Sequence, residues 1–503
     1  MTNAKHIAGL INSPNMEKIF NKRNTIIFVG VLTLWRLYLS AGLQLHPDEA
    51  YYWLWSRHLD VGYFDHSPLV AYFIWFTTLL SKSELWVRLS GTIVTLIVSF
   101  LTWKLALQLF GSIRVAAGSV MLLNVYPLTM LGLIVITPDI PVFLFWSLSV
   151  YIFWQIISSN KAWLWYALGL SFGLALLSKY TAILLVPCLF LYLVLTDDRR
   201  WLKTLHPYLS LLIGLLCFLP VVYWNSRHDW ISFTFQLSHG LGGQSYSFDR
   251  LVEYVVGQLL VAGPIVWFLG IYAAFACLFR KDKAQLFLIL MALPVILFFG
   301  FSSLKKLAGP NWPVFAYFTF SILVTKYFLD STSKIRRSLW YAALISSLSI
   351  SAILTLHARF NVIQLGRFSK ELAVTDATNW FYGWRELGAE LKKYPGMEFA
   401  VTPSHQLSAE IIYYTDEKIF VQTDEKVARI SQFNLWPWPD GLKGKNGFYV
   451  WAEGDAVGPY GEYFTSTTGI DTLSILRGGI DVRSYHIVPG QHSLIPPFPG
   501  NKP

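Results

Sequence analysis

Long apolar runs separated by short polar connections dominate the chain. Several runs reach the roughly 20 residues that an α-helix needs to cross the hydrocarbon layer, with no acid or base in their interior. The pattern therefore predicts a polytopic α-helical membrane protein with about 11–13 transmembrane helices. The candidate spans are residues 25–43, 84–110, 115–136, 140–157, 162–178, 181–196, 205–224, 251–279, 284–303, 312–329 and 338–356.

The connections between these runs form two alternating sets that differ in charge. The first set is short and basic, with Lys or Arg at 114, 161, 199–203, 280–283 and 334–337. Basic connections are typical of the cytoplasmic side, so this set and the N-terminus are predicted to be cytoplasmic. The second set is predicted to face outward and comprises 44–83, 137–139, 178–180, 225–250, 304–311 and everything after 357.

The composition agrees with a membrane protein. Hydrophobic residues make up 54% of the chain and charged residues only 14%, against roughly 25% charged in soluble domains. The net charge of +10 does not indicate nucleic-acid binding, because the basic residues form short clusters between apolar segments. All the cysteines, Cys188, Cys217 and Cys277, lie inside apolar runs, which favours neither a disulfide framework nor a thiolate metal site.

Hydropathy falls after residue 357 and divides the chain into two expected domains. Residues 1–357 are predicted to form a transmembrane catalytic domain, whose outward loop 44–83 contains aromatic helices at the membrane surface. Residues 358–503 are predicted to form a soluble extracytoplasmic α/β domain. Its expected elements are a helix capped by Asp376 that runs through Tyr394, strands at 398–402, 418–423 and 448–452, and a helix at 404–414.

The sharpest local feature begins at His46 and contains the adjacent carboxylates Asp48 and Glu49. Burial or mutual repulsion would raise the pKa of one of them toward a useful range for proton transfer. The alternative is an interfacial helix start, with Asp48 as the cap and Glu49 in the first turn. On spacing alone, the two interpretations are equally favoured.

Three further features on the outward side carry polar chemistry. Asp65 and His66 precede a proline-started apolar helix and suit a phosphate, a sugar hydroxyl or a metal, although turn chemistry is the favoured alternative. Asp139 offers a carboxylate in a tight hairpin, where a helix cap is the simpler interpretation. Lys179 ends an apolar run on the side where cations are disfavoured. It therefore indicates a lipid-linked phosphate, with a snorkelling lysine as the alternative.

These residues also carry a resemblance to a known family. The chain resembles the GT-C glycosyltransferases, in the branch that contains protein O-mannosyltransferase-like enzymes and lipid A aminoarabinose transferases. The resembling segments are Leu45 to Gly91, Leu174 to Ala182, Trp224 to Gly240 and Ser431 to Pro437.

The resemblance implies roles for particular residues. Asp48 matches the family's essential loop aspartate, with Glu49 beside it. Asp139 matches a second acidic site, Lys179 a lysine that contacts the carrier phosphate, and His239 a histidine of a later outward loop. One departure is that the aminoarabinose transferases have Tyr-Phe-Glu-Lys-Pro where this chain has Tyr63-Phe64-Asp65-His66-Ser67-Pro68. The donor phosphate site is altered, which argues against aminoarabinose as the sugar.

The function implied is a glycosyltransferase of the bacterial inner membrane, with its site and C-terminal domain on the periplasmic face. It would move a sugar from a polyprenyl-phosphate donor, with inversion, to lipid A or lipopolysaccharide, to another envelope glycan or, less favoured, to protein. Asp48 would orient or deprotonate the acceptor hydroxyl. Lys179, helped by His66, would stabilise the charge that develops on the leaving phosphate.

The expected partners are the lipid-linked sugar, the lipid or glycan acceptor and membrane lipids, with a monomeric chain and no nucleic acid. No cofactor is required by this chemistry, and a divalent metal at Asp65, His66 or His239 is an alternative without support from spacing. The competing class is a transporter or lipid flippase. Such proteins place paired charges near the bilayer midplane, often in repeated halves, whereas the polar candidates here collect at one surface.

Overall fold

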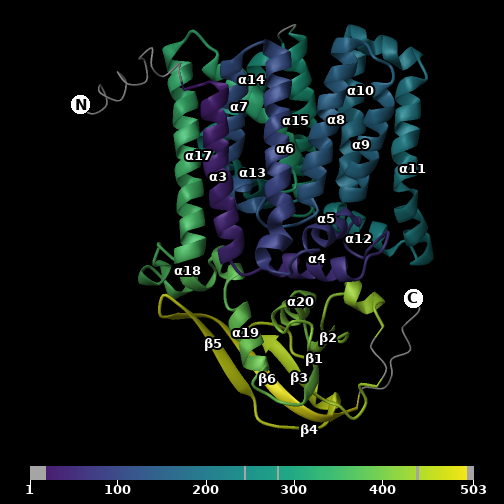
Figure 1. The fold of residues 1–503 in the computed structure, drawn as a ribbon, viewed down its shortest axis with the longest axis vertical. Coiled ribbons are helices and arrows are strands. Elements are labelled where there is room, and N and C mark those ends of the chain that lie inside the picture. The colour runs from purple at the N-terminus through teal and green to yellow at the C-terminus, as the bar shows by residue number, and fades with distance from the viewer. Residues whose placement is uncertain (1–18, 243–244, 280–281, 438–440, 495–503) are drawn as a thin grey trace.

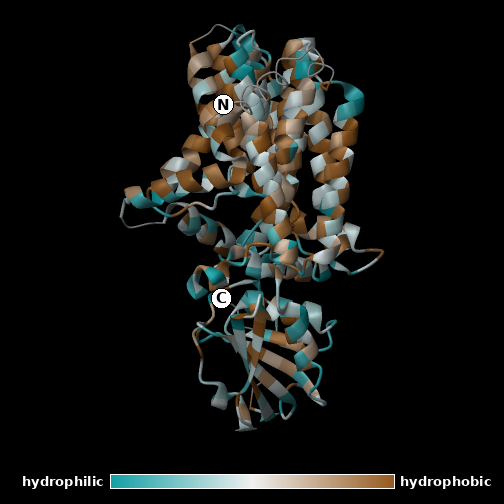
Figure 2. Ribbon diagram, turned by 90° about the vertical axis from the view of Figure 1, so that its left-hand side faces the viewer, coloured by the Kyte–Doolittle hydropathy of each residue, from teal (hydrophilic) through white to brown (hydrophobic). Residues whose placement is uncertain are grey.

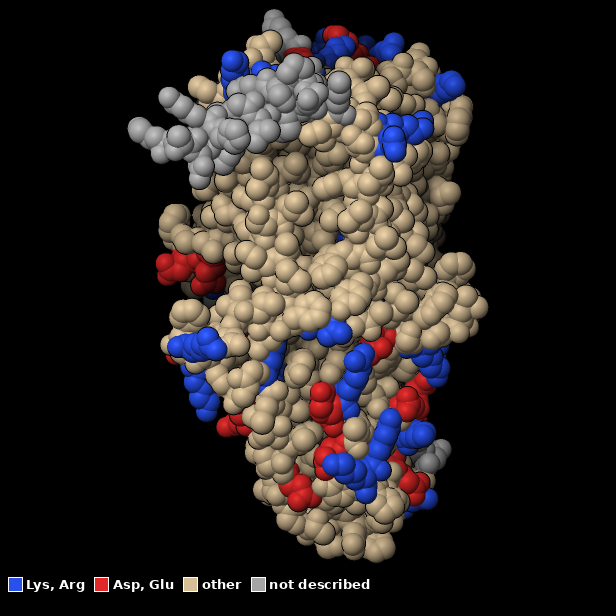
Figure 3. Space-filling view, turned by 60° about the vertical axis from the view of Figure 1, so that its left-hand side comes forward, with Lys and Arg blue, Asp and Glu red and all other residues tan. Residues whose placement is uncertain are grey.

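The computed structural model describes residues 19–242, 245–279, 282–437 and 441–494. It stacks a bundle of apolar helices on a smaller sheet domain (Figure 1). The bundle is mostly hydrophobic, whereas the sheet domain mixes hydrophobic and hydrophilic residues (Figure 2). On the face shown in Figure 3, charged residues gather toward the two ends of the molecule and are sparse over the middle of the bundle. This distribution is the one expected of helices that cross a bilayer.

Within the described residues, six helices are long and apolar enough to span a membrane. They are α3 (Lys22–Gly42), α6 (Glu84–Phe110), α8 (Asp139–Ser159), α11 (His206–Arg227), α15 (Lys283–Ser303) and α17 (Lys334–Phe360). Two bent pairs raise the number to eight if each is one span: η2 (Tyr180–Leu184) and α10 (Leu185–Leu195) with η3 (Asp197–Lys203), and α13 (Phe248–Ala262) with α14 (Pro264–Leu278). Shorter apolar helices are α7 (Ile113–Val125), α9 (Leu164–Ser178) and the continuous η4 (Val314–Ala316), α16 (Tyr317–Val324) and η5 (Thr325–Leu329). Each predicted span overlaps one or more of these elements, which confirms the predicted polytopic helical fold class. Among the described residues, six to eight spans qualify by length and composition, fewer than the 11–13 predicted.

One predicted span is not a continuous helix. The run 251–279 is broken between α13 and α14, whose axes differ by 107°. Gly263 at the break has a φ of +93°, and a Cβ there would lie 2.2 Å from the hydroxyl of Ser347. Pro264 then starts α14. The predicted run is therefore two helices that meet at a sharp bend, because only glycine fits the turn and proline starts a new helix after it.

The predicted span 115–136 is also interrupted. α7 ends at Val125, and a short π-helix, η1 (Leu128–Gly132), follows it. Arg36 of α3 is buried and donates to the carbonyl oxygens of Asn124 and Thr129 at 3.0 and 3.1 Å. A helix interruption inside a bundle leaves backbone carbonyls without helical partners. Arg36 supplies partners and fixes the chain that leads to the hairpin at Asp139.

The first outward loop forms α4 (Pro47–Arg57) and α5 (Leu69–Thr77). They lie across one end of the bundle, with α12 (Ile231–Leu241) nearby (Figure 1). α4 begins with a capping box in which the His46 N–H donates to Glu49 at 2.8 Å. Nearly all of α4 is buried, because it packs between the bundle and a helix of the sheet domain. The aromatic residues of this loop are therefore enclosed between two domains.

The sheet domain follows α17 through short helices. These are η6 (Leu365–Arg367), α18 (Lys370–Val374), η7 (Ala377–Phe381) and α19 (Trp384–Leu391). The strands and remaining helices are β1 (Met397–Thr402), α20 (His405–Tyr414), β2 (Phe420–Thr423), η8 (Gln432–Leu435), β3 (Asn446–Ala452), η9 (Tyr460–Glu462), β4 (Phe464–Thr467), β5 (Asp471–Arg477) and β6 (Ile480–Ser493). The strand order is β2-β1-β3-β6-β4, and β5 also pairs with β6. β1 is parallel to β2 and β3, and β6 runs antiparallel to its neighbours. α20 packs against α4, so this domain covers the first outward loop.

The helix expected from Asp376 through Tyr394 is two separate elements. Asp376 caps only η7, and Gly383, with a φ of +94°, interrupts the chain before α19 begins. Asp376 instead accepts from His357 at the end of α17 and from Arg477 of β5, at 2.8 and 3.1 Å. This buried cluster ties the sheet domain to the last helix of the bundle.

Candidate functional site

Glu49 is enclosed where α4 meets the bundle. Its side chain and that of Arg88 are 0% exposed, and Arg88 Nη2 lies 2.5 Å from Glu49 Oε2. The backbone N–H groups of His46 and Ile136 donate to the two carboxylate oxygens at 2.8 and 3.0 Å. Both oxygens are thus occupied by internal partners. These contacts anchor α4 to the bundle through Glu49. The catalytic role expected for Glu49 stays a prediction.

Asp48, the next residue toward the N-terminus, has a different environment. Its side chain is 40% exposed, and Gln406 of α20 donates to Asp48 Oδ1 at 2.7 Å. His46 Nδ1 lies 3.8 Å from Asp48 Oδ2. One face of this carboxylate remains accessible, so it can accept a hydrogen bond or a proton from a bound hydroxyl. Of the two adjacent acids, the geometry makes Asp48 the reactive candidate.

Lys179 and Asp139, which are 40 residues apart, form a direct ion pair. Lys179 Nζ lies 2.7 Å from Asp139 Oδ1, and both side chains are less than 10% exposed. Asn311 donates to Asp139 Oδ2 at 2.5 Å, and the Lys179 ammonium lies 5.8 Å from the centre of the Trp312 ring. A phosphate that binds here can contact the Lys179 cation. Asp139, the partner of Lys179, would keep its hydrogen bond from Asn311.

Asp65 connects the first outward loop to the sheet domain. It is buried and accepts from the Tyr51 hydroxyl at 2.6 Å and from Arg429 at 2.8 Å. Arg429 Nη2 also lies 3.1 Å from His405 Nε2. Burial, and next the charge of Arg429, lower the pKa of His405 to about 4. Both carboxylate oxygens of Asp65 thus have internal partners, which tie the first outward loop to the sheet domain.

His66 and His239 come close to the Lys179 pair. Burial lowers the pKa of His66 well below its usual range, and the positive charge of Lys179 contributes. Burial, and then the charge of Lys306, lower the pKa of His239. Both imidazoles are therefore neutral near pH 7 and can each donate one N–H to an anion.

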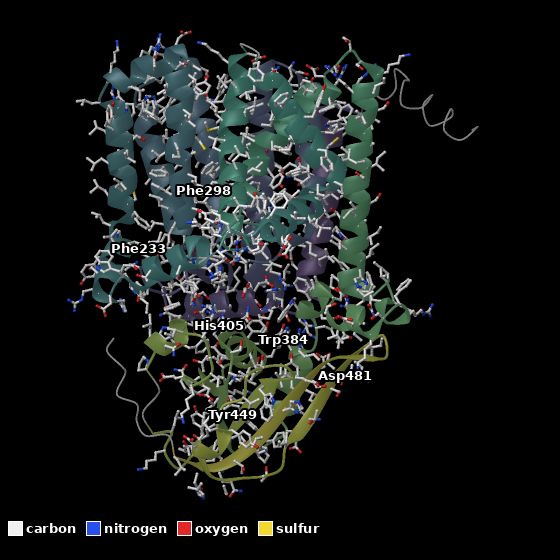
Figure 4. The ribbon with its side chains drawn as sticks, turned by 180° about the vertical axis from the view of Figure 1, so that it is seen from behind. Phe233, Phe298, Trp384, His405, Tyr449 and Asp481 are labelled. Carbon is white, nitrogen blue, oxygen red and sulfur yellow. The ribbon has the colours of Figure 1, made fainter. Side chains whose placement is uncertain are left out.

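One cavity of about 510 Å³ is lined by His66, Lys179 and His239 together. Its other walls are mostly apolar and include Phe233 of α12 and Phe298 of α15 (Figure 4). Further lining residues lie on the outer surface of the bundle, where they are 44–63% exposed: Ile183, Leu215 and Leu237. The cavity therefore joins a cationic polar end to an apolar surface that faces the membrane, and we call it the lipid-side cavity.

Comparisons with known proteins fit this geometry. Residues 65–224 match the family model of dolichyl-phosphate-mannose-protein mannosyltransferase. The structure of ArnT from Cupriavidus metallidurans bound to undecaprenyl phosphate superposes with a TM-score of 0.61 at 14% identity, and covers 92% of this chain and 97% of ArnT. Its apo structure gives a TM-score of 0.59 at 16% identity over the same shares. The chain has the GT-C fold. The family resemblance inferred from the sequence is confirmed.

A further protein is similar to part of this chain. The lipid A galacturonosyltransferase RgtD of Rhizobium johnstonii is 26% identical over 309 residues, which is 60% of this chain. The matched region spans 64% of the length of RgtD.

Tyr63 does not line the lipid-side cavity. Its ring stacks on Trp55 with centroids 4.2 Å apart, and its hydroxyl donates to the carbonyl oxygens of Trp55 and His58 at 3.2 and 3.0 Å. It is fully buried. Tyr63 lies in the resembling segment, for which the sequence predicts donor binding, and that role stays a prediction. In the structure the Tyr63 side chain supports the loop from inside.

Sequence reasoning missed several residues of the site, among them Asn311, Gln406, Arg429 and Tyr52. Gln406 and Arg429 reach Asp48 and Asp65 across separations of 358 and 364 residues, for which no local pattern gives a signal. Burial raises the pKa of Tyr52 well above its usual range, and the charges of Asp48, Asp65 and Asp139 add to this effect. A tyrosine in an aromatic helix is indistinguishable from core by pattern alone.

The alternative of a metal site has no support in the part of the chain that the structure describes. There, no group of three or more His, Cys, Asp or Glu side chains is arranged to hold a metal ion. Asp65 is bonded to Tyr51 and Arg429, and Asp139 to Lys179. No disulfide joins the cysteines within the described residues.

Proposed function

We propose that this chain is a polyprenyl-phosphate-dependent glycosyltransferase of the bacterial inner membrane that glycosylates lipid A or a related envelope glycolipid on the periplasmic face. The observation that carries the proposal is the lipid-side cavity, because Lys179, His66 and His239 lie at the polar end of an otherwise apolar space. An isoprenoid chain suits the apolar walls and its phosphate suits the cation and the imidazole N–H groups. The similarity to RgtD and the undecaprenyl phosphate in the ArnT structure support the same substrates.

The reaction would be a single displacement. The acceptor oxygen forms a bond to the anomeric carbon of the donor sugar, and the bond from that carbon to the phosphate oxygen breaks. The hydroxyl proton passes to Asp48, and polyprenyl phosphate leaves with the bonding electron pair. One displacement inverts the anomeric configuration.

Lys179 would stabilise the leaving phosphate by exchanging partners. It is paired with Asp139 at 2.7 Å, and a phosphate dianion at its Nζ competes with this carboxylate. Asn311 remains bonded to Asp139, so the carboxylate keeps a partner when Lys179 turns toward the donor. A buried charge left without any partner would cost several kcal/mol. The asparagine lowers that cost and leaves the cation available.

The proposal is tested by transfer with purified protein. Lipid A in detergent micelles is incubated with undecaprenyl-phosphate donors that carry galacturonic acid, a hexose, a hexosamine or a pentose, and products are measured by mass spectrometry. Addition of one glycosyl unit with release of undecaprenyl phosphate is the expected result. Failure of all donors on lipid A would exclude this acceptor. Net movement of the donor across a vesicle bilayer without glycosylation would establish a flippase instead.

A further inference from the structure

A second cavity, of about 570 Å³, lies in the sheet domain next to the bundle. It is walled by residues of α18, η7 and α19, the start of α20, and the ends of β3 and β6. Trp384 of α19 and Asp481 of β6 both line it. In Figure 4 they lie nearer the bundle than Tyr449, which is deeper in the sheet.

This cavity adjoins the proposed base. Gln406 lines it and donates to Asp48 Oδ1 at 2.7 Å. Trp380, another lining residue, has its ring 5.9 Å from that of His46, the N-cap of α4. A molecule that fills the cavity can therefore extend to the exposed side of Asp48.

The lining combines aromatic rings with hydrogen-bonding groups. The Arg483 guanidinium lies 5.0 Å from the centre of the Trp380 ring and 4.5 Å from the centre of the Trp384 ring. These contacts hold the three side chains together in one continuous surface. Asp455 and Asp481 each have one carboxylate oxygen bonded within the sheet domain, to the Ala452 N–H and the Ser484 hydroxyl. Sugars present an apolar C–H face to aromatic rings and hydroxyl groups to carboxylates. The cavity has the chemistry of a carbohydrate site.

The charge of this cavity is opposite to that of the lipid-side cavity. Its titratable lining residues are Asp376, Glu453, Asp455, Asp481, Lys370 and Arg483, so acids outnumber bases. In contrast, the charged residue that lines the lipid-side cavity is Lys179. Like charges repel, and the penalty is larger in a partly enclosed space. The sheet-domain cavity therefore disfavours a phosphorylated sugar, whereas the lipid-side cavity favours a phosphate.

One wall of the sheet-domain cavity lies at the end of the bundle. Lys370 and Val374 of α18 line it, and α18 sits at the foot of α17, where the bundle meets the sheet domain (Figure 1). Phe368, Leu372 and Val374 are 77%, 50% and 42% exposed. Exposed apolar side chains on a short helix at this level are typical of contact with the bilayer surface. The acyl chains of an amphiphile would remain in the bilayer next to them.

We infer that the sheet-domain cavity is the acceptor site, and that it holds an unphosphorylated sugar of a membrane-anchored glycolipid with its reacting hydroxyl directed to Asp48. This inference rests on the proposed function. It identifies the surface that recognises the acceptor and the kind of acceptor sugar that this surface binds. Trp380, Gln406 and the carboxylates of Asp455 and Asp481 are the recognition groups.

The test measures acceptor binding separately from transfer. Trp380→Ala removes an exposed ring, and Trp163→Ala, at the opposite end of the bundle, is the matched control with 61% exposure. Fluorescent lipid A is titrated into each protein without donor, and undecaprenyl phosphate into parallel samples. Trp380→Ala should weaken lipid A binding about tenfold, a typical loss for a stacking aromatic ring, and leave undecaprenyl phosphate binding unchanged. Trp163→Ala should change neither.

A second arm tests the charge argument. Lipid A with two, one or no phosphates is compared for binding, and the unphosphorylated form should bind best to the wild-type protein. Asp455→Asn with Asp481→Asn should reduce this preference, while Asp471→Asn, a β5 acid outside the cavity, should preserve it. The inference would be overturned if the wild-type protein did not bind lipid A. It would also be overturned if Trp380→Ala bound lipid A as wild type does, or if the double Asp→Asn variant kept the preference for unphosphorylated lipid A. Binding that shows the expected responses without transfer would instead contradict the proposed function.

Discussion

Glu49 and Asp48 are adjacent carboxylates for which the structure predicts opposite mutant phenotypes. In Glu49→Gln, the amide nitrogen brings two N–H donors next to the N–H donors of Arg88, His46 and Ile136. It leaves the Arg88 charge buried without a counterion, since both side chains are 0% exposed. Breaking a buried pair on one side costs about 3–5 kcal/mol. Glu49→Gln should therefore be strongly destabilised.

The size of this effect can be measured in detergent. Because the entropy of unfolding grows with chain length, such a loss corresponds to a fall of roughly 3–5 °C in the unfolding midpoint. Arg88→Met in the Glu49→Gln background removes the stranded charge, so the double variant should regain part of the loss. The unfolding midpoint is measured by tryptophan fluorescence on heating. Activity is measured as glycosyl transfer by the protein that remains folded.

One result would refute this assignment. If Glu49→Gln melts within about 1 °C of wild type but loses transfer by more than about 100-fold, the size of effect of losing a general base, then Glu49 takes part in the reaction. Glu49→Asp serves as a control for side-chain length, because it keeps the charge but shortens the reach to Arg88.

Further predictions concern the remaining polar residues. Asp48→Asn should lower transfer by about 10²- to 10⁴-fold with an unchanged melting midpoint, because asparagine can still accept from Gln406; transfer within a few fold of wild type would remove Asp48 from the mechanism. Lys179→Ala should fold but lose affinity for undecaprenyl phosphate in a direct binding assay, and an unchanged Kd would leave only a structural role. The pKa values of His66 and His239 are lowered, and a bound phosphate opposes that shift. Undecaprenyl phosphate should therefore bind more tightly as pH falls below about 6.5, and less so in His66→Gln. His405 has a pKa of about 4, below its unfolded value, so its contribution to stability is present above pH 6.5 and is lost as pH falls; about 2 kcal/mol is gone by pH 5. His405→Gln should flatten the dependence of the melting midpoint on pH in this range.

The spans were predictable because bilayer thickness dictates apolar length, but the breaks within them were not. The Gly263-Pro264 pair lies in an apolar run that also fits one kinked helix. The sharp bend depends on the close contact between Gly263 and Ser347, which the sequence does not reveal. The strands β4 to β6 were likewise missed, since short polar-apolar alternation near turns is weak evidence without the partner strand.

One feature of the sequence indicates a structural role for Glu49. Arg88 lies one turn inside the apolar run that begins at residue 84, and an arginine there needs a buried partner. The acids of the preceding loop are the nearest candidates. The contacts of Gln406 and Arg429 had no comparable signal, because they depend on how the sheet domain docks.

Docking of the sheet domain also explains how Asp48 is held. α4 is anchored to the bundle through Glu49 and Arg88, and α20 covers its other side. Glu410 of α20 is buried there, with neither carboxyl oxygen bonded among the described residues. Burial, followed by the charge of Glu49, raises the pKa of Glu410 well above its usual range. Burial therefore favours the neutral form of Glu410, which avoids a second buried negative charge between the two helices. Asp48 is thus held on an anchored helix, next to Gln406 of the sheet-domain cavity, before a substrate binds. A base that is already in position is what rapid displacement requires.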